Sequence, residues 1–296
     1  MTTPLRCVMC DNAAAGSEQS ADVHSNVRKF KDETFNVWRC DSCGSLHARD
    51  EVDLAHYYGG YPFHEMAIDW RLGSMYRNML GRLRDAGITK SHKVLDYGCG
   101  GGTLVKYLIS RGYDVVGYDE FSEQFRDPAT LSRQYDAIIA QDVIEHVANP
   151  WELAALFDRL SKPGSVIVVG TPSADALDLK RSATFVHALH QPYHRHILSK
   201  QALLSVGEKQ GWALHRYYPT MYANTPVPFV NSRFVLHYLA CFDNTLDVAF
   251  DGIQINSWKL YSPMTVFYAL FGYFLAPHTD VMAIWKRPLA LAAGNS

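Results

Sequence analysis

Clustered positive charge is absent from this sequence. Its 28 lysines and arginines are nearly matched by 30 aspartates and glutamates, so the formal net charge of the 296 residues is −2. The sequence pI is close to 6.7. Proteins that bind nucleic acids usually carry a basic patch or stripe. A nucleic-acid partner is therefore disfavoured, although near-neutral charge alone does not exclude one.

A secretory leader and a long hydrophobic run are also missing. The start, MTTPLRCVMC, has no apolar segment of the signal-peptide kind, so we expect a cytoplasmic protein. The most apolar late stretch, residues 262–277, is uncharged and contains two prolines. It is shorter than the roughly 20 residues that a spanning helix needs. We expect no membrane span: a buried element is favoured for this stretch, and surface association is the second interpretation.

Four of the six cysteines form two C-x-x-C pairs, Cys7 with Cys10 and Cys40 with Cys43. Two such pairs can close a tetrahedral thiolate site, and four protein ligands leave no open position for a substrate. We therefore expect a structural zinc, with residues 27–30 and 34–40 as strands of a hairpin between the pairs. Unrelated thiols or a redox pair are the alternatives. Cys99 and Cys241 stand alone, and packing explains them better.

Strands and helices are expected to alternate after residue 90. Apolar runs predict strands at 94–97, 114–118, 135–140, 165–170 and 212–218, with helices at 103–111, 151–160 and 200–210. This alternation is typical of a Rossmann-like, doubly wound α/β fold with a mostly parallel sheet. We expect a zinc-ribbon module at 1–50, a helical lid at 51–90 and the α/β domain at 91–296.

A glycine-rich loop follows the first of these strands. The string is Asp96-x-Gly98-x-Gly100-x-Gly102, and the next strand ends at Asp119, where a carboxylate can accept hydrogen bonds from both hydroxyls of a ribose. The pair indicates a nucleoside-bearing cofactor. The glycine spacing differs from the G-x-G-x-x-G dinucleotide fingerprint, so an NAD-dependent enzyme is disfavoured.

Together these motifs resemble those of the class I S-adenosylmethionine-dependent methyltransferases, specifically the subgroup with an amino-terminal zinc ribbon. LDYGCGGG matches their first motif, Asp119 their second, YDAIIAQDVIEHVANP the fourth-strand segment and KPGSVIVVGTP the fifth. The resemblance covers most of residues 1–218 and implies S-adenosylmethionine as cofactor. It places Gln141 and Asp142 beside the cofactor. It also indicates that Tyr58, with Tyr57 and Tyr61, folds over it, although ordinary helix packing is an equal alternative for these tyrosines.

The segment between Asp119 and Tyr135 departs from that pattern. Only 16 residues separate the two, so we expect the usual third strand and its helix to be shortened or missing. The residue that contacts the adenine amino group cannot be placed by the resemblance, and Asp127 is a guess.

Histidines supply the candidates for a general base, since a neutral imidazole suits proton removal near pH 7. His146 follows the 135–140 strand, and His194 and His196 lie in the connection after the 165–170 strand. We expect catalytic roles for His194 and His146, with a structural role as the alternative for each. We place His187 and His190 on a helix surface. The spacing of these histidines matches no metal-ligand motif, so a metal site is not expected there.

An insertion of some sixty residues, 219–279, separates the 212–218 strand from a last strand at 280–288. It is rich in apolar and aromatic residues, which predicts a cap with an acceptor pocket. A dimer surface or a membrane-contacting patch is the alternative.

We therefore expect an enzyme that methylates an oxygen or carbon atom of a small, apolar or aromatic acceptor such as a natural product, sugar or quinone-like compound. Methylation of RNA or protein, and a non-catalytic cofactor-binding or assembly protein, are the alternatives. The acceptor and the oligomeric state are not determined by the sequence.

Overall fold

Two sheets organise the protein, as seen in a computed structural model that describes residues 5–14, 16, 18–59 and 68–289. The main sheet has the strand order β5-β4-β6-β7-β10-β9 and the smaller one the order β1-β2-β3-β8. The strands are β1 Ser20–His24, β2 Thr34–Arg39, β3 Leu46–Ala48, β4 Lys93–Tyr97, β5 Asp114–Tyr118, β6 Tyr135–Gln141, β7 Ser161–Pro172, β8 His196–Ile197, β9 Ala213–Tyr218 and β10 Asp280–Lys286. The helices are α1 Leu54–Tyr58, α2 Trp70–Asp85, α3 Thr103–Ser110, α4 Pro150–Leu160, α5 Val186–Leu189, α6 Lys200–Lys209, α7 Ser232–Ala240 and α8 Pro263–Phe271.

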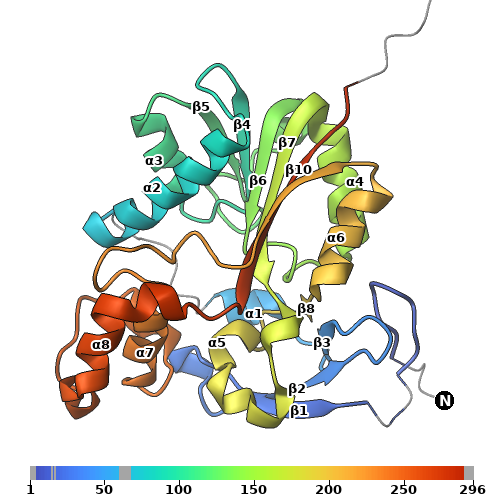
Figure 1. Ribbon diagram of the computed structural model, residues 1–296. Helices are drawn as coiled ribbons and strands as arrows, with labels where there is room; N and C mark the ends of the chain where they lie inside the picture. The colour runs from blue at the N-terminus through green and yellow to red at the C-terminus, as the bar shows by residue number, and fades with distance from the viewer. Residues whose placement is uncertain (1–4, 15, 17, 60–67, 290–296) are drawn as a thin grey trace, which may run out of the picture.

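The main sheet confirms the expected doubly wound α/β fold. Strands β5, β4, β6 and β7 are parallel, and β10 runs antiparallel between β7 and β9. Helices α2 and α3 lie on one side of the sheet and α4 and α6 on the other (Figure 1). Each face is a separate hydrophobic core, because the central strands are apolar on both sides.

Capping residues fix where the flanking helices begin. Asp69 accepts hydrogen bonds from two backbone N–H groups at the start of α2, and Asn149 caps α4, whose first residue is Pro150. Ser199 caps α6 in the same way. An acceptor side chain before the first turn satisfies backbone donors that a helix leaves unpaired. These short polar residues therefore set the length of the loops that reach the site.

The third strand of the usual fold is missing, as the sequence predicted. Between β5 and β6 the chain forms only turns and a 3₁₀ helix, Pro128–Ser132. Asp127 is exposed and caps that helix by accepting a hydrogen bond from the Ala129 N–H. Nothing in this geometry tests the guess that Asp127 contacts adenine.

The small sheet corrects part of the expected zinc-ribbon hairpin. Strand β2 lies where it was predicted, but β1 is formed by 20–24, and the predicted strand at 27–30 is wrong. Residues 28–30 form a 3₁₀ helix, because the Arg28 N–H donates to Asp247 and the Phe30 side chain is buried. The fourth strand, β8, comes from the α/β domain: Leu46 of β3 pairs with Ile197. The amino-terminal module is therefore joined by strand pairing to the segment that follows β7.

Residues 262–277 are mostly exposed, so the favoured expectation of a buried element is wrong. The stretch forms α8 and the 3₁₀ helix Gly272–Leu275, and Phe274 exposes 79 % of its surface. Among the described residues no helix combines the length and apolar character needed to cross a bilayer.

Candidate active site

The glycine loop joins β4 to α3 at the carboxyl edge of the parallel strands. A Cβ on Gly98 would lie 2.3 Å from Val143, so this glycine is required by packing between the loop and the segment after β6. Gly102 is similarly crowded by Phe125. A Cβ on Gly100 would meet nothing within 4 Å. Of these three predicted glycines, Gly100 is the one that faces open space.

Two carboxylates border this loop. Asp119 Oδ2 accepts from the Gly100 N–H at 2.9 Å, and its Oδ1 accepts from the Phe121 N–H at 2.8 Å. Each carboxylate oxygen keeps acceptor capacity for a ribose hydroxyl. Asp96 is 3 % exposed, and its burial, followed by repulsion from Asp119, raises the pKa of Asp96 to about 7. Both sequence-predicted acids therefore meet at one place.

Gln141 and Asp142 lie at the end of β6, as expected for that strand. Asp142 has a left-handed backbone (φ 54°) and accepts a 3.0 Å hydrogen bond from the Gln141 amide. Gly170 of β7 leaves room for the Gln141 side chain, because a Cβ there would overlap it. Burial and repulsion from Asp280 raise the pKa of Asp142 to about 7. A strained backbone with a perturbed carboxyl group is a common feature of functional sites.

Helix α1 brings Tyr58 against this edge. The Tyr58 ring stacks on Phe121, with ring centres 4.7 Å apart, and its hydroxyl lies 3.1 Å from His146 Nδ1. The lid expected from Tyr58 therefore connects the Asp119 loop with the histidines. Tyr57 has a different place: its hydroxyl donates to Glu33, and its ring packs on Phe30. Tyr61 lies outside the described residues.

His146 and His194 come together with Glu145, although 48 residues separate the two histidines. Their ring centres are 4.8 Å apart, and His194 Nε2 lies 4.0 Å from Glu145 Oε1. One ligand atom from each of the three residues lies within 4.8 Å of the others, which is close enough to hold a metal ion. Sequence spacing did not predict a metal site here, because the fold brings His194 to Glu145 and His146 from the loop after β7.

Backbone carbonyls place the ring proton of both His194 and His146. His194 Nδ1 lies 2.8 Å from the Ala188 carbonyl, which only accepts, so in the neutral ring Nδ1 carries the proton and Nε2 the lone pair. His146 Nδ1 lies 3.0 Å from the Tyr193 carbonyl, so its Nδ1 also carries the proton in the neutral ring, with the Tyr58 hydroxyl 3.1 Å from the same nitrogen. Burial lowers the pKa of His146 to about 4 and that of His194 well below its usual range. Both rings are neutral near pH 7.

Glu145 is a candidate site residue that sequence reasoning did not single out. It is fully buried, its Oε2 accepts from Thr171, and within the described part of the chain its Oε1 has no hydrogen-bond partner. Burial, followed by repulsion from Asp142, raises the pKa of Glu145 well above its usual value. The only signal for it in the sequence was its place beside His146.

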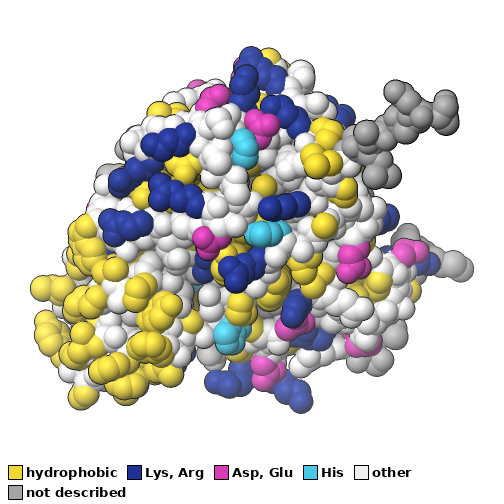
Figure 2. Space-filling view, turned by 45° about the horizontal axis from the view of Figure 1, so that its top comes forward, with side chains coloured by type: hydrophobic (Ala, Val, Ile, Leu, Met, Phe, Trp, Pro, Cys, Tyr) yellow, Lys and Arg dark blue, Asp and Glu magenta, His cyan; other side chains and the backbone are white. Residues whose placement is uncertain are grey.

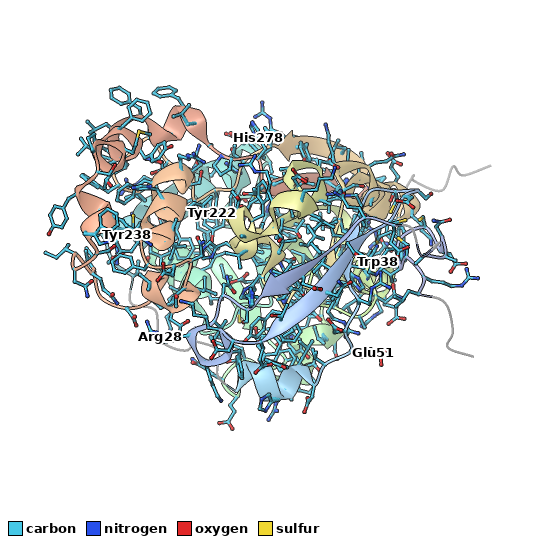
Figure 3. All side chains as sticks on the ribbon, turned by 90° about the horizontal axis from the view of Figure 1, so that it is seen from below. Arg28, Trp38, Glu51, Tyr222, Tyr238 and His278 are labelled. Carbon is cyan, nitrogen blue, oxygen red and sulfur yellow. The ribbon has the colours of Figure 1, made fainter. Side chains whose placement is uncertain are left out.

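Two aromatic residues that the sequence analysis did not name complete the site, one from the expected lid at 51–90 and one from the expected cap at 219–279. Tyr76 of α2 and Tyr222 of the 219–279 insertion stack with ring centres 6.1 Å apart. Asp96 and Asp142 both raise the pKa of these tyrosines, after burial, so the four groups lie close together. Figure 3 shows Tyr222 on the inner side of the α7–α8 lobe. The start of the insertion therefore lines the site, while its helices stand to one side.

The remaining histidines of this region are structural. His190 is 4 % exposed, stacks on Tyr193 and lies 2.6 Å from the Asn26 side chain, and His187 contacts the amide of the same asparagine. The expectation of a helix-surface position for this pair is wrong, because the small sheet covers it. His196 Nε2 lies 3.1 Å from the Ala148 carbonyl.

The four cysteines predicted as metal ligands converge. The Cys7 and Cys43 sulfurs are 3.5 Å apart, those of Cys10 and Cys40 are 3.6 Å apart, and all four lie within 4.8 Å of one another. A tetrahedral zinc with bonds of about 2.3 Å separates its sulfurs by about 3.8 Å. His47 Nε2 lies 3.1 Å from Cys7 Sγ, in the place of an outer-shell partner. The residues present fit one structural zinc ion.

A family model described as "Methyltransferase domain" matches residues 72–217, which include β4, the glycine loop, Asp119, Glu145 and both histidines. These residues form a methyltransferase domain. Its mostly parallel sheet and its Asp96-to-Gly102 loop are those that the sequence resemblance predicted.

Curated relatives of the methyltransferase domain are ubiquinone biosynthesis O-methyltransferases. The mitochondrial one of Arabidopsis thaliana is 31 % identical over 102 residues, which are 27 % of this chain and 32 % of that protein. The one of Psychrobacter cryohalolentis is 30 % identical over 103 residues, 27 % of this chain and 40 % of that protein. The aligned region thus spans about a third to two fifths of the length of these relatives.

Solved structures of methyltransferases superpose on the domain more loosely. A SAM-dependent methyltransferase from Archaeoglobus fulgidus is 17 % identical with a TM-score of 0.43, covering 71 % of this chain and 94 % of that one. An S-adenosylmethionine-dependent methyltransferase from Mesorhizobium loti is 13 % identical with a TM-score of 0.43, covering 71 % and 98 %.

Proposed function

We propose that this protein transfers the methyl group of S-adenosylmethionine to an oxygen or carbon atom of a small-molecule acceptor, with His194 as general base. The observation that carries the proposal is the arrangement of His194. Its Nδ1 is held by a backbone carbonyl, its Nε2 keeps the lone pair, and Glu145 stands 4.0 Å away. Nucleophile activation generally needs a base that a third group orients.

The cofactor would be held by the residues around the glycine loop. Asp119 has acceptor capacity left for the ribose hydroxyls, the open space at Gly100 admits a close neighbour, and Asp96 would face the amino group. Gln141 and Asp142 border the same edge. When bound, S-adenosylmethionine supplies an electrophilic methyl group on a sulfonium. These features support the assignment.

His194 would take the acceptor's proton at Nε2 as the acceptor oxygen or carbon attacks. A neutral ring is required, and burial keeps His194 neutral near pH 7 by lowering its pKa. A low pKa also weakens a base, and the new Nε2–H would face Glu145 Oε1, 4.0 Å away, as a hydrogen-bond acceptor. His146 would orient the acceptor, since its ring contacts that of His194 edge to face.

We infer that the four cysteines bind one zinc whose role is structural. Cys7 contacts His47, and His47 Nδ1 lies 3.0 Å from His196 Nδ1, two residues from the proposed base. The Arg195 and His196 N–H groups both donate to the Glu145 carbonyl. The zinc would thereby hold the loop on which His194 and Glu145 meet.

The acceptor would be apolar or aromatic and quinone-like. Tyr76 and Tyr222 present stacked rings beside Asp142, and such surfaces hold flat apolar molecules. The curated relatives are named for ubiquinone biosynthesis, which agrees with this class. A cytoplasmic location and the general-base role remain predictions.

The first test is calorimetric titration of the purified protein with S-adenosylmethionine and S-adenosylhomocysteine, with NAD as control. We expect the first two to bind and NAD not to bind. Turnover is then measured as S-adenosylhomocysteine formed with an alkyl-substituted catechol as acceptor. His194→Ala should lower kcat about 10²–10⁴-fold with little change in cofactor affinity. His215→Ala, an exposed histidine on β9, is the matched control and should retain activity.

Three outcomes would oppose the proposal. Failure of both sulfur ligands to bind contradicts the cofactor assignment. Binding without turnover of catechols or other small hydroxylated acceptors favours a non-catalytic or macromolecular role. Near-normal kcat in His194→Ala returns that residue to a structural role.

A further inference from the structure

The outer face of the insertion is a large apolar surface. We call residues 253–275 the apolar lobe; its strongly exposed aromatic side chains are Trp258, Tyr261, Phe267, Phe271 and Phe274, with exposed fractions from 42 % to 79 %. At about 200 Å² per aromatic side chain, these five alone expose on the order of 600 Å². That equals the largest patch on a typical monomer, and apolar patches of this size mark interaction sites.

Figure 2 shows the apolar lobe as a continuous group of hydrophobic side chains at one corner of the molecule. Figure 3 shows rings of the same region projecting outward from its edge. The surface is therefore convex rather than grooved, a shape that suits insertion into a soft medium better than reception of a peptide.

The lobe is firmly attached at its inner side. Asn231, at the start of α7, donates to the Tyr268 carbonyl of α8 at 3.0 Å, and the Phe229 N–H donates to the Ala269 carbonyl. Ala269 is 1 % exposed. The outward rings therefore belong to a fixed helix pair, and their exposure is not the result of a loosely attached segment.

Charge around the lobe is arranged on two sides. Between residues 253 and 275 the only charged residue is Lys259, and Asp243 pairs with it at 2.9 Å. The other acids of the insertion lie toward the small sheet, where Asp251 pairs with Arg28 at 2.6 Å. The apolar lobe itself thus carries no acidic side chain.

The side of the apolar lobe that faces away from these acids is basic. Figure 2 shows Lys and Arg side chains directly above the lobe, and we call this side the basic flank. Helix α2, which carries the exposed Arg77, lies against the start of the insertion, because Asn78 donates to the Tyr222 and Asn224 carbonyls. Exposed aromatic residues beside basic ones are the pattern of proteins that lie in a membrane interface and prefer anionic lipids.

We propose that the apolar lobe docks the protein on the surface of an anionic lipid bilayer, with the rings of 258–274 in the interface and the basic flank over the headgroups. A second copy of the chain is the alternative occupant, and the test below distinguishes it from a bilayer. The proposal does not depend on methyl transfer, because docking needs no cofactor.

Flotation of the full-length protein with lipid vesicles tests the proposal. We expect it to float with vesicles that mix phosphatidylcholine and phosphatidylglycerol, and to bind phosphatidylcholine vesicles more weakly. Phe274→Asp should weaken binding about tenfold or more, and Arg77→Glu about fivefold on the anionic vesicles only. Ile109→Asp, on the exposed face of α3, is the matched control and should bind like the wild type.

Two results would overturn the proposal. One is absence of flotation with either vesicle type while circular dichroism shows folded protein. The other is a stable dimer in light scattering that Phe274→Asp converts to monomer, with no vesicle binding by the wild type. Because all variants are scored without acceptor or cofactor, failure here leaves the proposed enzymatic function unaffected, and the reverse also holds.

Discussion

Replacing Asp96 by asparagine should stabilise the cofactor-free protein and damage cofactor binding. The side chain is 3 % exposed, and its pKa rises from 3.8 to about 7 on folding. A carboxyl group with a raised folded-state pKa lowers stability as pH rises, because folding opposes its ionisation. The loss begins above the unfolded value of 3.8 and is complete above pH 7. The full loss of unfolding free energy is about 4 kcal/mol, at 1.36 kcal/mol per pKa unit.

The assay is urea unfolding of the wild type and Asp96→Asn from about pH 5 to pH 8, with linear extrapolation to water. The advantage of the variant should grow by about 2–3 kcal/mol over that range, since wild-type Asp96 ionises within it. Asp114→Asn, at an exposed position on β5, is the control and should stay within about 0.5 kcal/mol at every pH. Groups such as Asp142 and Glu145 titrate in both proteins, so their contributions largely cancel.

A difference that is flat from pH 5 to pH 8 would refute the claim that Asp96 carries a raised pKa. The effect of Asp96→Asn on cofactor binding is measured separately. Calorimetry should show S-adenosylmethionine binding more weakly to Asp96→Asn by roughly tenfold or more, because the amino group of the cofactor loses its charged partner. Equal affinity would remove Asp96 from the cofactor site. Stability given up for binding is a common pattern at functional sites.

Two further substitutions test the other ends of the site. Asp119→Ala should weaken cofactor binding roughly 10- to 100-fold, because it removes the hydrogen-bond acceptor expected for the ribose hydroxyls. Unchanged affinity in calorimetry would show that Asp119 does not bind the ribose. Cys40→Ser should lose the metal and lower the midpoint temperature of unfolding, because a thiolate is a better zinc ligand than a hydroxyl. Full zinc content in the variant by elemental analysis would disprove the four-cysteine site.

The parts of the candidate site that the structure places where the sequence analysis put them are local in the chain. The Asp96-to-Gly102 loop and the end of β6 each occupy a few consecutive residues whose turn chemistry is legible in isolation. The four cysteines could be recognised as a ligand set from the sequence in the same way, because each pair lies on its own tight turn. Such features depend on backbone geometry over short distances, and periodicity together with glycine placement reports that geometry.

Features made by distant segments were the ones that sequence reasoning missed. Glu145 gains its importance from His194, 49 residues later, and from burial that no local pattern reveals. The apolar run 262–277 looked like core material, since composition does not say whether another element covers it. His190 looked like a surface residue because the strand that buries it begins 170 residues earlier. Tertiary packing decides all three.

Strand β8 has a consequence for how this chain is made. The knuckle cysteines leave the ribosome before β8 does, and the edge of β3 stays unpaired until residues 196 and 197 are synthesised, about 150 positions later. Closing so long a loop is slow, and an open strand edge meanwhile invites wrong partners. A metal ion bound during synthesis would reduce the number of non-native conformations without completing the small sheet. The segment that carries the knuckle cysteines is therefore synthesised well before the strand that it needs to reach its final structure.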